Sequence, residues 1–182
     1  MKRLFSAMTL LLFLVGCGLS SGSSDNIITL RDKISRGAAC SFTASVSLDY
    51  GDYLYNFVAF CETDATNNMR VTVLEPTPIA GISGEIDGRS GKIVFDEQVL
   101  AFELLADEQI VPICVPWLLI KALRGGYINS SGATSAQIDD TFNGCEFRTE
   151  VYFNEMGTPS EVEIVWQGKR IASIIIKDFA FL

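Results

Sequence analysis

The chain has 182 residues, a length that fits one domain and leaves little room for a second. Hydrophobic residues make up 48% and charged residues 20%, and the mean hydropathy of +0.29 excludes a disordered, collagen-like or low-complexity chain. The 14 Lys and Arg against 22 Asp and Glu give a net charge of -8, which disfavours nucleic-acid binding because phosphate contacts need a basic surface. The sequence has no His, which excludes His-based catalytic triads and HExxH zinc sites.

The first 16 residues have the pattern of a signal peptide. Met1-Lys2-Arg3 is a cationic start, and the apolar run Leu4–Val15 is shorter than the roughly 20 residues of a membrane-spanning helix. The run ends in Leu14-Val15-Gly16-Cys17, which resembles the lipobox of bacterial lipoproteins, whose cysteine is diacylated and becomes the mature N-terminus. We therefore predict a signal peptide over residues 1–16 and lipid attachment at Cys17. An ordinary signal peptide followed by a chance cysteine is the alternative.

Residues 17–24 continue from that cysteine as a Gly/Ser-rich tether with a reach of about 15 Å. Two acyl chains anchor a protein stably at a bilayer, so the single domain predicted over residues 25–182 is expected to stay close to the membrane surface. That domain is predicted to open with a helix over residues 25–36, because Ile27, Leu30 and Ile34 recur at helical spacing and Gly37 is a typical stop.

The segment Asp49-Tyr50-Gly51-Asp52 lies between two strand-like runs and predicts a hairpin with a two-residue turn on Tyr50-Gly51. This register places Cys40 opposite Cys61 and makes one face of the hairpin wholly apolar. Since the mature domain has an even number of cysteines, we predict a disulfide between Cys40 and Cys61 and, by elimination, one between Cys114 and Cys145. Reduced cysteines that fill the core are the alternative.

The rest of the chain predicts a meander of antiparallel strands with one helix in the middle. The helix is expected over residues 112–124, with proline in or near its first turn and Gly125-Gly126 at its end. It is apolar on nearly every side, so it must be covered all round. The strands are expected at residues 69–75, 82–86, 92–96, 99–104, 133–138, 145–153, 161–166 and 170–181.

This order of elements resembles the LolA/LolB-like superfamily of bacterial lipoproteins, most tellingly in Phe42–Val46, Arg70–Pro76 and Pro159–Phe181. The resemblance implies an α+β fold, a strongly curved antiparallel half-barrel with helices packed in its concavity and a hydrophobic cavity. It further implies a membrane-anchored, extracytoplasmic lipoprotein that binds lipid or acyl chains as a non-enzymatic carrier or acceptor. The alternative is an envelope sensor or scaffold that binds another envelope protein and fills the cavity with its own side chains.

Large apolar residues on the predicted inner faces are the candidates to line the cavity: Phe42, Val46, Tyr53, Tyr55, Phe57, Phe95, Trp117, Ile120 and Trp166. A densely packed core is the alternative for the same residues. The carboxylate pairs Asp139-Asp140 and Glu161/Glu163 are better interpreted as solvated surface, and no nucleophile motif occurs. We therefore expect no enzyme activity, metal or cofactor. The expected partners are the membrane through the lipid and a hydrophobic ligand or, in the alternative, another envelope protein.

Overall fold

The structure, a computed structural model, describes residues 25–66 and 68–182. The predicted signal peptide, Cys17 and the tether lie outside the described residues, so these predictions are not tested. In the described part, eleven strands form one sheet and two short strands form a separate pair. None of the helices there is long and apolar enough to cross a membrane.

The helices are α2 (Asp25–Ser35) and α3 (Val115–Gly125), with short 3-10 turns η1 (Thr77–Ile79) and η2 (Pro112–Cys114). The strands of the large sheet are β1 (Cys40–Asp49), β2 (Leu54–Thr63), β3 (Met69–Glu75), β4 (Ser83–Ile86), β5 (Ser90–Phe95), β6 (Gln98–Glu103), β9 (Tyr127–Ser131), β10 (Ser135–Phe142), β11 (Cys145–Phe153), β12 (Pro159–Trp166) and β13 (Lys169–Phe181). The separate pair is β7 (Leu105–Ala106) with β8 (Gln109–Ile110).

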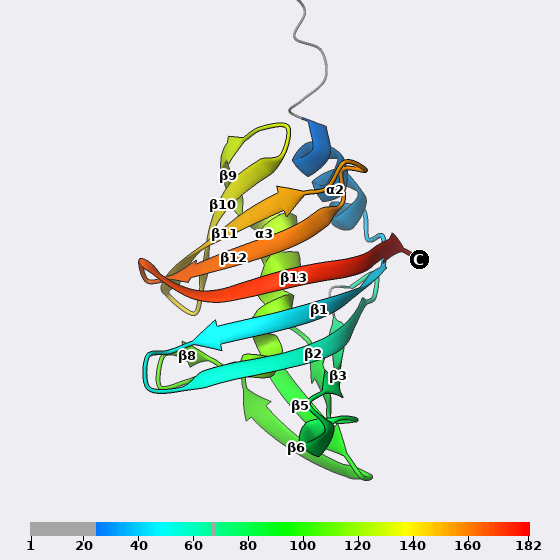
Figure 1. Cartoon of the computed structure of the whole chain (residues 1–182), viewed down its shortest axis with the longest axis vertical. Helices are drawn as coiled ribbons and strands as arrows, with labels where there is room; N and C mark the ends of the chain where they lie inside the picture. The colour runs from blue at the N-terminus through cyan, green and yellow to red at the C-terminus, as the bar shows by residue number, and fades with distance from the viewer. Residues whose placement is uncertain (1–24, 67) are drawn as a thin grey trace, which may run out of the picture.

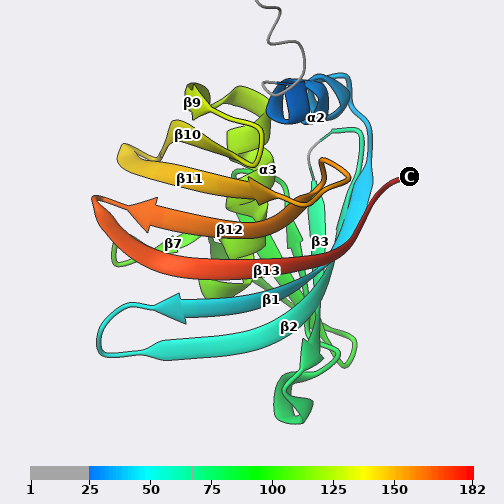
Figure 2. The same ribbon diagram turned by 45° about the horizontal axis from the view of Figure 1, so that its top comes forward.

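The strand order of the large sheet is β6-β5-β4-β3-β2-β1-β13-β12-β11-β10-β9. The first and last strands of the chain are therefore neighbours in the centre, and strands from the middle of the chain form both edges. To pass from β6 at one edge to β9 at the other, the chain must cross the sheet, and it does so through α3 (Figures 1 and 2). The predicted α+β class is confirmed as a mostly antiparallel sheet with two α-helices in the described residues.

The core lies on the face of the sheet that α3 covers. On β1 the alternate residues Phe42, Ala44, Val46 and Leu48 are all at most 3% exposed, as the predicted apolar face requires. The helix predicted over residues 112–124 is found as α3, with the short turn η2 over its first three residues, and eight residues of α3 from Val115 to Leu123 are buried. Helix α3 is thus covered by the sheet and by α2.

Two arginines join the helices by each binding the C-terminal end of the other helix. Arg31 of α2 donates through Nε to the Leu123 carbonyl at 3.0 Å and also binds the Gly126 carbonyl. Arg124 of α3 donates to the Ile34 carbonyl at 3.3 Å. Since the last carbonyls of a helix lack partners within it, these cationic donors satisfy both helix ends.

The predicted register of the first hairpin is wrong by two residues. The Tyr50 N–H donates to the Tyr53 carbonyl at 3.0 Å, so the turn is centred on Gly51-Asp52 instead of Tyr50-Gly51, and Asp49 pairs with Leu54. A shift of two residues keeps every side chain on its predicted face, because side chains alternate with period two. It changes the partners, however, and Cys61 lies opposite Phe42 instead of Cys40.

Candidate functional site

Six of the nine side chains predicted to line a cavity are buried in the core. Phe42, Val46, Phe57, Trp117, Ile120 and Trp166 are between 0% and 8% exposed. An open cavity large enough for an acyl chain would leave its lining side chains accessible to water. Their burial therefore favours a packed interior over an empty cavity between them.

Aromatic contacts fill the space around three of these residues. Phe42 stacks on Phe179 with ring centroids 5.8 Å apart, and Trp166 stacks on Phe147 at 5.9 Å. Trp117 meets Phe142 edge-on at 5.3 Å. The Trp166 indole N–H donates to the Glu108 carbonyl at 3.1 Å, so its polar atom is also satisfied.

The other three predicted lining residues lie at the surface. Tyr53 is 65% exposed, Tyr55 39% and Phe95 48%. Tyr55 contacts Tyr50 edge-on, and the Tyr50 hydroxyl donates to the Ile110 carbonyl. Phe95 is the last residue of β5 and lies at the turn of the β5–β6 hairpin. The structure therefore does not bring the nine residues together around one space.

The four cysteines of the described chain are free, so the predicted disulfides are absent. Cys40 lies beside Thr63, with its N–H donating to Thr63 Oγ1 at 2.9 Å and its Sγ 3.3 Å from the same oxygen. In the observed register Cys61 is a diagonal neighbour of Cys40, at a typical separation beyond disulfide reach. Burial raises the pKa of the Cys40 and Cys61 thiols and raises that of Cys114 to about 12, which favours inert, protonated core thiols.

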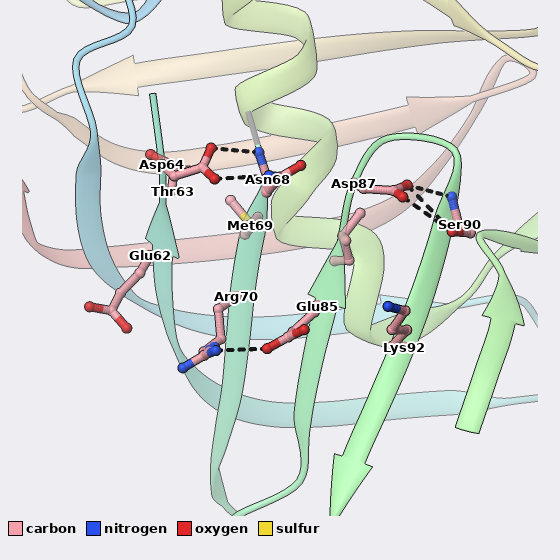
Figure 3. A pocket seen from close by; sticks show the side chains of 11 residues that line it. Glu62, Thr63, Asp64, Asn68, Met69, Arg70, Glu85, Asp87, Ser90 and Lys92 are labelled. Atoms are coloured by element: carbon pink, nitrogen blue, oxygen red, sulfur yellow. Dashed lines mark hydrogen bonds and ion pairs between the residues drawn. The ribbon is translucent and has the colours of Figure 1, made fainter. Parts of the chain in front are cut away.

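A cavity of about 490 Å³ opens over β2, β3, β4 and β5 (Figure 3). We call it the β2–β5 groove. Nine polar or charged residues and two apolar ones line it: Glu62, Thr63, Asp64, Asn68, Met69, Arg70, Glu85, Ile86, Asp87, Ser90 and Lys92. A second hollow of about 390 Å³ beside Pro76 touches Val46 and Phe57, but its other lining residues are mostly polar and belong to the outer face.

The groove carries a row of alternating charges set by the strand register. Glu62 pairs with Arg70, Arg70 with Glu85, and Glu85 with Lys92, so four neighbouring strands present acidic, basic, acidic and basic side chains in turn. Arg70 Nη2 lies 2.7 Å from Glu85 Oε1, and both side chains are about half exposed. Figure 3 shows this pair between Glu62 and Lys92. Opposite charges directly across a ladder stabilise the pairing and hold the row in place.

Two aspartates fix the loops at the end of the groove. Partial burial acts to raise the pKa of Asp64, but hydrogen bonds from Thr66 and Asn68 outweigh it and the pKa lies below its ordinary value. The backbone N–H groups of Ser90 and Arg89 lower the pKa of Asp87. Both carboxylates are thus ionised at neutral pH and occupied by their own turns.

This arrangement suits recognition of a polar, charged surface. Of the carboxylates that line the groove, Glu85 is ion-paired with Arg70, and Asp64 and Asp87 accept hydrogen bonds within their own turns. Within residues 25–66 and 68–182, no group of three His, Cys, Asp or Glu residues is placed to hold a metal ion. The sequence prediction missed this groove, because its charges lie on four strands that come together through the register alone.

No protein-family model matches the chain, and no curated protein matches it by sequence. Solved structures do resemble it. A LolA superfamily protein from Nitrosomonas europaea aligns with a TM-score of 0.46 at 8% identity, over 89% of this chain and 94% of that one. A putative outer membrane lipoprotein-sorting protein domain from Vibrio parahaemolyticus aligns with a TM-score of 0.42 at 9% identity, over 85% and 90%.

A third similar structure is the CwlD amidase from Clostridioides difficile in complex with the GerS lipoprotein, with a TM-score of 0.43 at 15% identity, over 91% of this chain and 99% of the matched one. The LolA-like resemblance that the sequence indicates thus recurs among solved structures.

Proposed function

We propose that this chain is a lipid-anchored, extracytoplasmic module of the cell envelope that recognises another envelope protein at the β2–β5 groove and acts by binding alone. In this proposal the sheet wraps α3 as a half-barrel whose concavity the helix occupies. The observation that carries it is the contrast between an interior filled by its own side chains and an open, charged groove of about 490 Å³. The anchor rests on the Cys17 motif.

The chemistry of the groove favours a protein over a lipid. Sites for apolar ligands are concave and lined predominantly by hydrophobic side chains. In the groove, Met69 and Ile86 are the apolar lining residues and the rest are polar or charged. A row of alternating charges instead matches a polypeptide surface of complementary charges, and such complementarity contributes to specificity and to the rate of association.

Site-specific photocrosslinking in the host envelope tests the partner. A photoreactive residue in place of Lys92, at the end of the charged row, is expected to crosslink one protein species. The matched control replaces Lys177, an exposed lysine on the outer face of β13. The crosslink from position 92 is expected to weaken in the Arg70→Glu variant, which makes three neighbouring charges of the row acidic. Equal crosslinking from positions 92 and 177 would contradict the proposal.

Lipid extraction tests the carrier function predicted from the sequence. Native mass spectrometry of the protein purified from its host, followed by organic extraction, is expected to give no stoichiometric lipid. Fatty acids or phospholipids are expected to leave the melting temperature unchanged, whereas a ligand at 100 times its Kd would stabilise the fold by about 2.7 kcal/mol. A bound lipid in a one-to-one ratio would restore the carrier function and overturn this proposal.

A further inference from the structure

The edge strand β6 offers a row of unpaired backbone groups. It pairs with β5 without a register shift, from Ser90–Glu103 to Phe95–Gln98, and has no strand on its other side among the described residues. A two-residue hairpin closes on a hydrogen-bonded pair, after which bonded and non-bonded pairs alternate. The N–H and C=O groups of Val99, Ala101 and Glu103 therefore point away from β5, toward the open side.

The side chains of β6 leave this edge unprotected. Val99 is 63% exposed and Leu100 66% exposed, and successive side chains lie on opposite faces, so both faces beside the edge are apolar. The Phe102 side chain is half-buried and its ring lies over Gly91. Proteins usually blunt an edge strand with lysine, proline or a bulge, and the central residues of β6 include none of these.

Acidic residues lie at both ends of the open edge. Asp96 and Glu97 form the turn before β6, and Glu103 is its last residue. The nearest lysine of the ladder, Lys92, pairs across from Ala101 and also neighbours Glu85. An added strand with Lys or Arg at its ends would complement these charges. Antiparallel pairing with a second copy would instead bring the acidic turn of one copy near Glu103 of the other, which like-charge repulsion disfavours.

We propose that β6 binds an extended segment of a partner protein by strand addition, and that this segment has an apolar centre and Lys or Arg at its ends. The proposal rests on the proposed function as a protein-binding module and specifies how the partner is held. The two surfaces are continuous, because β5 pairs with β6 and also contributes Ser90 and Lys92 to the β2–β5 groove.

The test uses the full mature lipoprotein in detergent and a labelled synthetic peptide, Lys-Thr-Val-Ile-Val-Thr-Lys with both ends capped. We expect saturable binding by fluorescence anisotropy and slower amide hydrogen exchange at Val99, Ala101 and Glu103. A peptide with Glu in place of both Lys is the matched control and is expected to bind at least about tenfold more weakly, given the acidic ends of the edge. Equal binding of the two peptides would overturn the stated charge preference.

Two variants at Ala101 test whether the backbone N–H on the open side of β6 is needed for binding. Ala101→Pro removes an N–H that points to the open side and leaves the bonds between β5 and β6 intact, so proline is tolerated there. It is expected to weaken binding by about tenfold or more. Ala101→Val keeps the N–H and is expected to bind as the unchanged protein does. Equal binding by Ala101→Pro, or no added protection at the three amides, would overturn strand addition.

Two further outcomes separate this proposal from the proposed function. Concentration-dependent dimerisation that protects the same three amides without peptide would show that a second copy is the occupant, and would overturn the proposal. Loss of peptide binding with the crosslink from position 92 retained would overturn strand addition and leave the proposed function in place. Peptide binding by a protein that also carries stoichiometric lipid would support strand addition and overturn the proposed function.

Discussion

The strands β9 and β6 form the two edges of the sheet, and they differ in how they are protected against pairing with another strand. At one edge, β9 carries the polar run Asn129-Ser130-Ser131, and its pairing with β10 has a bulge between Gln137 and Ile138. At the other edge, β6 is regular and exposes Val99 and Leu100. Polar side chains and bulges are the usual means of preventing unwanted strand pairing. Strand β9 thus carries features that discourage pairing with another strand, whereas β6 lacks them and leaves its edge open to pairing.

The difference extends one strand inward. Next to β9, the β10 residues Ala136 and Ile138 are at most 2% exposed, and α3 packs on β10. Next to β6, the β5 residues Ile93 and Val94 are half-buried and Phe95 is 48% exposed. The β9 side thus belongs to the core, whereas the β5–β6 hairpin contributes little apolar burial. Local stability is expected to follow this difference.

Hydrogen exchange should show the largest contrast between the two edges. Ile138 and Thr149 form a pair in the β10–β11 ladder and are both fully buried, so their amides are expected to exchange at least about a thousandfold more slowly than those of Val99 and Ala101. Exchange measured by NMR on the protein without a partner checks this. Comparable protection at the two sites would mean that β6 is already covered.

Truncating a buried side chain near β9 should lower the free energy of unfolding far more than truncating an exposed side chain on β6. Ile138→Ala is expected to lower the free energy of unfolding by about 3 kcal/mol, because it opens a hole in the core. Leu100→Ala, at a 66% exposed position, is expected to change it by less than about 0.5 kcal/mol. Chemical denaturation of both variants provides the measurement. A cost above about 1 kcal/mol for Leu100→Ala would show that β6 is part of the core.

An arginine side chain donates hydrogen bonds to the backbone just before β9, and among the described residues no arginine does so at β6. Arg31 donates to the Leu123, Ala122 and Gly126 carbonyls, directly before β9 begins. Arg31→Met is expected to cost about 2 kcal/mol, since it removes charge-assisted hydrogen bonds from a part-buried helix end.

The control for this arginine is Arg36→Met, at the residue directly after the same helix. Arg36 pairs with Asp32, but its side chain is 78% exposed, and such a pair contributes about 0.3 kcal/mol. Thermal unfolding of both variants distinguishes them. Equal losses would show that the bonds from Arg31 to α3 do not stabilise the junction.

The sequence predicted the elements of this fold better than their pairing. The strands at residues 69–75 and 145–153 and the apolar helix are found as expected, because alternation and helical periodicity are local signals. The inner face of β1 is also as predicted. The hairpin register failed because the turn is centred on Gly51-Asp52, one residue later than predicted, and the alternating pattern of side chains is the same for both positions.

What the sequence missed depends on contacts between distant segments. The β2–β5 groove exists because four strands place Glu62, Arg70, Glu85 and Lys92 in one row, and no local pattern encodes that register. Strand β9 was also missed, since Asn-Ser-Ser has the composition of a loop and pairs here as an edge strand. The filled interior could not be derived either, because the same aromatic residues suit a cavity wall or a core.

The turn that leads into the edge strand β6 can be compared with the β10–β11 turn, which lies one strand inward from the other edge. Asp96-Glu97, before β6, has φ values of 47° and 64°, whereas the β10–β11 turn reaches the same region with Asn143-Gly144 at 49° and 81°. Because glycine and asparagine adopt positive φ more readily, replacing Asp96-Glu97 with Asn-Gly is expected to stabilise the fold by about 1 kcal/mol. The same replacement removes two negative charges from one end of β6 and should weaken binding of the Lys-ended peptide. Higher stability together with weaker binding would show that the acidic turn serves recognition at the cost of stability, whereas unchanged binding would remove the turn from the docking surface.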